Sequence, residues 1–157
     1  MKKYIQIALL LYVSCGYSQE FGQNKVQYEA FDWNYIRSPH FDVYFYKQNS
    51  DLAKFTVNVS EDAYEQISKH LRWTIKKPIS IIVYNSHNDF QQTNVVDSYM
   101  YEGIGGVTEL FKNRVVIPFE GSYDQFRHVI HHELVHALVN DMMYGGSIQG
   151  IITGKIK

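Results

Sequence analysis

Apolar and polar residues recur with two different periods along the chain, and these periods predict its secondary structure. Between residues 52 and 71 the apolar side chains return every three or four positions, which predicts a helix over about residues 52–73. Residues 19–38 show no clear period, and residues 85–98 are polar and predict a loop. Runs of β-branched and aromatic residues predict four strands, at residues 41–46, 79–84, 107–110 and 114–119.

A second apolar pattern predicts the last helix, over about residues 123–143. Ser122 and Gln125 have the S-x-x-Q spacing of a capping box, and Gly145-Gly146 marks the end. Because apolar residues occupy most of its surface, this helix is expected to lie centrally in the fold. The predicted order is therefore β-α-β-β-β-α, an α+β class with the sheet packed on the last helix.

The beginning of the chain has the layout of a secretory signal peptide. Lys2 and Lys3 precede an apolar stretch at residues 4–13, and small and polar residues follow. The stretch is too short to span a membrane. We expect residues 1–19 to be removed and the mature protein to be exported, to the periplasm, the outer membrane or the medium. Cys15, the only cysteine, lies in this segment, and both lipid attachment and removal with the peptide stay open.

Length and charge narrow the class of function. Residues 20–157 suit a single domain with a sizeable core. The full chain carries 15 basic and 16 acidic residues, so it lacks the basic excess that binds nucleic acid or an anionic membrane surface. The charge balance therefore predicts no nucleic-acid partner. The shortness of the apolar stretch at residues 4–13 predicts no transmembrane span.

The candidate chemistry is concentrated in the HExxH segment His132-Glu133-Leu134-Val135-His136. Residues four apart on a helix share one face, so His132 and His136 can ligate the same Zn²⁺ with bonds of about 2.0–2.1 Å. Glu133 would then be the general base for a water whose pKa the metal lowers to about 7. Unpaired polar groups in a buried helix cost about 1–3 kcal/mol each. This cost favours metal binding over hydrogen-bonded or solvated histidines.

Other polar residues of the predicted helix are weaker candidates. His128 repeats the spacing but lies about 12 Å from His136 along the axis, too far to share one metal. For His128 we expect either a packing role or a role in orienting a zinc ligand, and for His131 a structural role. A metzincin would have a third histidine at position 142, where Met142 stands, and Asp141 lies on a different face of the helix. No Glu, His or Cys follows the motif, so a third zinc ligand is not found.

The predicted strand at residues 107–110 leaves two interpretations open. It can form an edge to which a peptide adds in extended form. It can equally be one half of a structural hairpin around Lys112-Asn113. In that case cross-strand pairing accounts for Glu109 and Arg114.

Several segments resemble one family. The stretch from Arg127 to Ala137 resembles the active helix of peptidase MA-like, gluzincin-type metallopeptidases. Residues 24–28, 41–46 and 85–91 are similar to the N-terminal part of large exported bacterial proteins that carry such a domain ahead of a TolB-like β-propeller. The resemblance covers essentially all of the mature chain and implies a zincin-like fold with a mixed sheet.

By this resemblance, His132 and His136 are zinc ligands, Glu133 is the general base, and the substrate is a peptide or protein. The family's third ligand is a glutamate in a later N-E-G-x-x-E-Y-like helix, which this sequence does not contain. We therefore expect residues 20–157 to be the N-terminal part of a metallopeptidase domain within a longer protein. The alternatives are a non-catalytic binding module of the cell envelope, tied to a propeller partner, and a TolB-like transport accessory protein.

Overall fold

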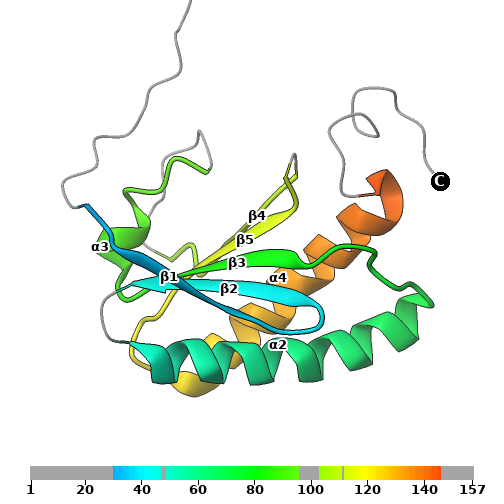
Figure 1. Ribbon diagram of the computed structural model, residues 1–157, viewed down its shortest axis with the longest axis horizontal. Helices are drawn as coiled ribbons and strands as arrows, with labels where there is room; N and C mark the ends of the chain where they lie inside the picture. The colour runs from blue at the N-terminus through cyan, green and yellow to red at the C-terminus, as the bar shows by residue number, and fades with distance from the viewer. Residues whose placement is uncertain (1–29, 47–48, 96–102, 111, 146–157) are drawn as a thin grey trace, which may run out of the picture.

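The computed structural model describes residues 30–46, 49–95, 103–110 and 112–145. The predicted signal peptide and Cys15 lie outside these residues. The described part forms a five-stranded sheet with two long helices on one face (Figure 1). In chain order the elements are β1 (Trp33–Arg37), β2 (Phe41–Tyr46), α2 (Ser50–Leu71), β3 (Ile79–Tyr84), α3 (His87–Phe90), β4 (Val107–Glu109), β5 (Arg114–Pro118) and α4 (Tyr123–Tyr144). The α+β class is confirmed.

The sheet is mixed, with the strand order β1-β2-β3-β5-β4. β2, β3 and β5 run parallel, whereas β1 pairs antiparallel with β2 and β4 pairs antiparallel with β5. The parallel pair β2 and β3 is joined through α2, because a parallel connection must cross a face of the sheet. The expected hairpin of β4 and β5 is present, and Asn113 before β5 has a φ of 49°, which asparagine tolerates. Among the described residues, β4 is thereby an edge strand of the sheet.

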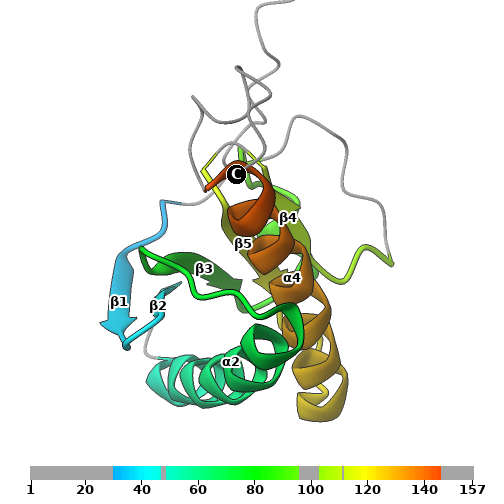
Figure 2. The ribbon, with the colours of Figure 1, turned by 90° about the vertical axis from the view of Figure 1, so that its right-hand side faces the viewer.

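Alternation along the strands separates the two faces of the sheet. Side chains on the inner face are buried against α2 and α4, which lie next to each other beneath it (Figure 2). From the strands, this core contains Phe41, Val43, Ile79, Ile81, Val83, Val115 and Ile117. From the helices, it contains Leu52, Val59, Ala63, Ile67, Phe126, Ile130, Leu134, Ala137 and Leu138. Most of the apolar positions that predicted α2 are the ones it buries, whereas α4 buries only part of its apolar residues.

Two elements were not expected from the periodicity. β1 is an edge strand whose side chains are almost all exposed, so no burial constraint imposes an alternating pattern on it. α3 is a single helical turn, too short to show a period, and it begins where the Ser86 hydroxyl accepts the Asp89 N–H at 3.1 Å. Its Phe90 is buried on the outer face of the sheet with Tyr46, Tyr84 and Val116.

The ends of α4 agree with the sequence, but its position does not. The Ser122 hydroxyl accepts the Gln125 N–H at 3.4 Å, and Gly145 closes the helix with a φ of 66°. The expectation that α4 lies centrally is wrong for the described residues. Only the stripe that faces the sheet and α2 is buried, and Val135 is 39% exposed. None of the helices in the described ranges is long and apolar enough to cross a membrane.

Candidate metal centre

Successive turns of α4 bring the two motif histidines together. The Nε2 atoms of His132 and His136 are 3.2 Å apart, and the two rings stand at 74° with their centroids 4.9 Å apart. Both side chains are exposed. The i, i+4 spacing therefore places two ring nitrogens on one accessible face of the helix, as the sequence predicts.

This separation fits two ligands of one zinc ion. Two nitrogens bound at about 2.0–2.1 Å in tetrahedral geometry stand about 3.3–3.4 Å apart, close to the observed 3.2 Å between the Nε2 atoms. Zinc binds the unprotonated nitrogen of a neutral imidazole, so both rings would carry their proton on Nδ1 when the two Nε2 atoms hold the metal. Within the described ranges, no three His, Cys, Asp or Glu side chains gather as a metal-binding group. Among the described residues, the candidate metal centre thus has two ligands, His132 and His136.

Glu133 points away from the solvent and is held by a residue of the edge strand. The residue is only 7% exposed, and its Oε2 accepts a hydrogen bond from the Thr108 hydroxyl at 2.7 Å. The same hydroxyl lies 3.0 Å from the backbone oxygen of Glu133. Because Glu133 is paired and both histidines are exposed, the expected cost of unpaired polar groups in a buried helix does not arise, and this argument for metal binding was wrong. The argument for metal binding rests instead on the distance of 3.2 Å between the Nε2 atoms of His132 and His136.

A pair of glycines allows the chain before β4 to approach α4 closely. A Cβ atom on Gly106 would lie 2.9 Å from Cγ of Glu133 and 3.1 Å from Cγ1 of Val129, and one on Gly105 would lie 3.1 Å from Cγ2 of Val129. Neither their contact with Glu133 nor the role of Thr108 was predicted, because both depend on how β4 docks on α4.

The other histidines of α4 do not join His132 and His136. His128 is exposed, so the packing role is wrong for it, whereas the alternative that it orients a zinc ligand stays a prediction. His131 is half-buried and lines a groove of about 510 Å³ between α2 and α4, together with Arg127 and Asp62. The structure thus separates the pair at 132 and 136 from the rest of this histidine-rich helix.

Asp141 has a structural partner. It is buried, and its Oδ2 accepts the indole N–H of Trp73 at 2.8 Å. Trp73 follows α2, so this bond ties the end of α2 to the last turns of α4. The contact agrees with the prediction that Asp141 lies on a different face of the helix from the exposed motif histidines.

Replacing Trp73 by phenylalanine is expected to lower the free energy of unfolding by about 1–3 kcal/mol. The variant keeps an aromatic ring but leaves the buried Asp141 carboxylate without its donor. Urea unfolding of the variant measures the effect, and Trp33→Phe on the more exposed strand β1 is the matched control. If Trp73→Phe costs as much in a protein whose Asp141 is already replaced by leucine, the loss does not come from the hydrogen bond.

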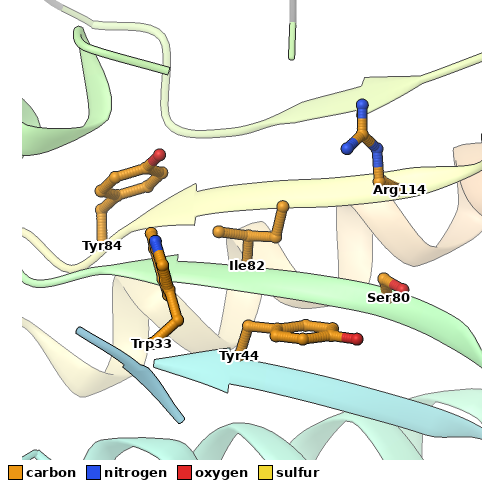
Figure 3. A pocket seen from close by; sticks show the side chains of 6 residues that line it. All are labelled: Trp33, Tyr44, Ser80, Ile82, Tyr84 and Arg114. Atoms are coloured by element: carbon orange, nitrogen blue, oxygen red, sulfur yellow. The ribbon is translucent and has the colours of Figure 1, made fainter. Parts of the chain in front are cut away.

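A second concave region lies on the opposite face of the sheet. It is a hollow of about 410 Å³ lined by the side chains shown in Figure 3, namely Trp33, Tyr44, Ser80, Ile82, Tyr84 and Arg114. Arg114 donates through Nε to Glu109 at 2.6 Å, the cross-strand pair that the hairpin predicted. Half of these lining residues are aromatic and none of those described is a histidine, and the sheet separates the hollow from His132 and His136. It therefore contributes no group to the candidate metal centre.

The distance between the two Nε2 atoms on α4 suits a cation held by two imidazoles, and the carboxylate of Glu133 is oriented separately by Thr108 of β4. Comparisons of the chain with models of protein families, with curated proteins and with solved structures gave no match.

Proposed function

We propose that this chain carries the zinc helix of an exported, gluzincin-type metallopeptidase with a zincin-like fold, and that the intact protein hydrolyses peptide bonds. One observation carries the proposal. Two Nε2 atoms converge to 3.2 Å on an exposed face of α4, while Glu133, the next residue after His132, is buried and oriented by Thr108. A structural helix does not need this combination of exposed ligands and an ordered carboxylate.

His132 and His136 would hold the Zn²⁺, which when bound supplies Lewis-acid polarisation of the scissile carbonyl and lowers the pKa of water to about 7. Glu133 would take a proton from the attacking water through Oε1, the oxygen that Thr108 does not bond. The same carboxyl would then give this proton to the leaving amine. The family that the motif resembles takes its third ligand from a glutamate of a later helix, and this sequence contains no Glu after the motif.

β4 supports a peptide as the substrate. It is the edge strand next to α4, so its outer backbone groups are placed to pair with a chain in extended form. Thr108 of the same strand contacts the proposed base. A peptide that adds to β4 would therefore lie alongside the element that orients Glu133.

Removal of zinc from the intact protein tests the proposal. We expect hydrolysis of a peptide library to fall to the uncatalysed rate when a strong zinc chelator is added, and to return when Zn²⁺ is restored. Hydrolysis that is insensitive to the chelator would contradict the zinc mechanism. Stoichiometric zinc binding without hydrolysis of any peptide would instead favour the non-catalytic envelope module.

A further inference from the structure

We infer that Thr108 is a positioning residue for Glu133, and that its hydroxyl selects which carboxylate oxygen stays available for proton transfer. The role in catalysis rests on the proposed function of Glu133, whereas the contact itself does not. The inference begins from one hydroxyl group on β4 that lies within reach of two acceptors, both of them belonging to Glu133.

The carboxylate is the stronger of these two acceptors. Thr108 Oγ1 lies 2.7 Å from Oε2 and 3.0 Å from the backbone oxygen of Glu133. A hydroxyl has one hydrogen to donate, and a bond to an ionised oxygen is shorter and stronger than one to a neutral carbonyl. Since Glu133 is only 7% exposed, water competes weakly for Oε2. The hydroxyl therefore binds Oε2 and leaves Oε1 for chemistry.

The donor is itself held in place. Thr108 pairs with the fully buried Val115 in the register of β4 and β5, and a β-branched side chain has few rotamers. Gly106 also contacts the side chain of Glu133. A Cβ atom at position 106 would lie 2.9 Å from Cγ of Glu133, so any other residue there would collide with it. A glutamate side chain has three rotatable bonds, so these contacts remove orientations that a free carboxylate would sample.

The first experiment measures the contact without any assay of activity. A double-mutant cycle combines Thr108→Val with Glu133→Met, and the unfolding equilibrium constant of each variant is measured in urea. We expect Thr108→Val to raise this constant about tenfold when Glu133 is present. In the Glu133→Met background, where only the backbone acceptor remains, we expect an increase of about threefold or less. Thr108→Ser keeps the hydroxyl and should retain the coupling to Glu133.

The matched control is Thr56→Val on α2. The Thr56 hydroxyl is also buried and donates to a backbone oxygen, that of Leu52, at 2.8 Å. Its replacement should change the unfolding constant by the same factor whether or not Glu133 is replaced. If Thr108→Val also has the same effect in both backgrounds, the hydroxyl does not act on the carboxylate and the inference is overturned.

The second experiment uses the intact protein with zinc bound. We expect Thr108→Val to lower kcat about 10–100-fold, with KM and zinc affinity unchanged, and Thr108→Ser to recover most of the loss. A full kcat in Thr108→Val, in a protein whose turnover needs Glu133, would overturn the positioning role and leave the proposed function standing. Coupling in the unfolding cycle without any hydrolysis by the intact protein would overturn the proposed function and leave only the contact of Thr108 with Glu133 standing.

Discussion

Replacement of Glu133 by glutamine is expected to lower kcat/KM of the intact protein for a peptide by about 10²–10⁴-fold. An amide has nearly the shape of a carboxyl group but does not take a proton at neutral pH. Its oxygen still accepts a hydrogen bond from Thr108, which in the parent bonds Oε2 at 2.7 Å, so the side chain keeps its place. Zinc binding should be unchanged, because the two imidazoles are untouched.

Peptide turnover and zinc affinity of Glu133→Gln are to be measured side by side. Glu65→Gln on α2 is the control, since Glu65 is an exposed glutamate whose only described ion pair is with Lys69, at 2.7 Å. We expect that control to keep kcat/KM within about twofold, because exposed ion pairs contribute little to stability. Undiminished turnover in Glu133→Gln would rule out the base role and with it the proposed mechanism.

Replacement of His132 or His136 by alanine is expected to weaken zinc binding by the intact protein by more than about 100-fold. Loss of a residue that only supports a ligand costs about 10–100-fold, and loss of the ligand itself costs more. Both side chains are exposed, so without zinc the free energy of unfolding should change by no more than about 0.5 kcal/mol. The loss of zinc affinity can thereby be distinguished from a loss of folding stability.

Competition with a chromophoric chelator measures these zinc affinities. His128→Ala and His131→Ala are the controls, because both histidines lie on the same helix outside the motif, and these variants should bind zinc as the parent does. If His128→Ala weakens binding as much as His132→Ala, then the metal is held by a different set of residues. If all four variants bind zinc equally well, the pair of Nε2 atoms is not the zinc site.

The candidate site divides into a part that local sequence predicts and a part that it does not. The i, i+4 spacing predicts that His132 and His136 share a face, because an α-helix turns about 100° per residue, and the structure brings their Nε2 atoms to 3.2 Å. The contact of Thr108 with Glu133 joins residues 25 positions apart. No local period carries that information, since it depends on β4 packing beside α4.

The helices and strands likewise include some that local sequence predicts and some that it does not. α2 agrees closely with expectation because it has one buried side, so its apolar residues recur with the period of a helix. β3 agrees because it lies in the middle of the sheet, where both faces are largely covered and a nearly continuous apolar run is typical of a strand. β1 was missed because its side chains are mostly exposed and its existence depends on pairing with β2. The exposure of α4 was also predicted wrongly, because apolar residues such as Val135 need not all find a partner.

Local sequence was enough to predict the two long helices, the central strands, the capping of α4 and the shared face of His132 and His136. These features follow from backbone geometry and from the pattern of burial along each element, both of which act over a few residues. The docking of β4 on α4 was needed to establish that the motif histidines face solvent, that Glu133 is buried, and that Thr108 and Gly106 orient its carboxylate. Those outcomes depend on which surfaces pack together, and packing joins residues that no local pattern relates.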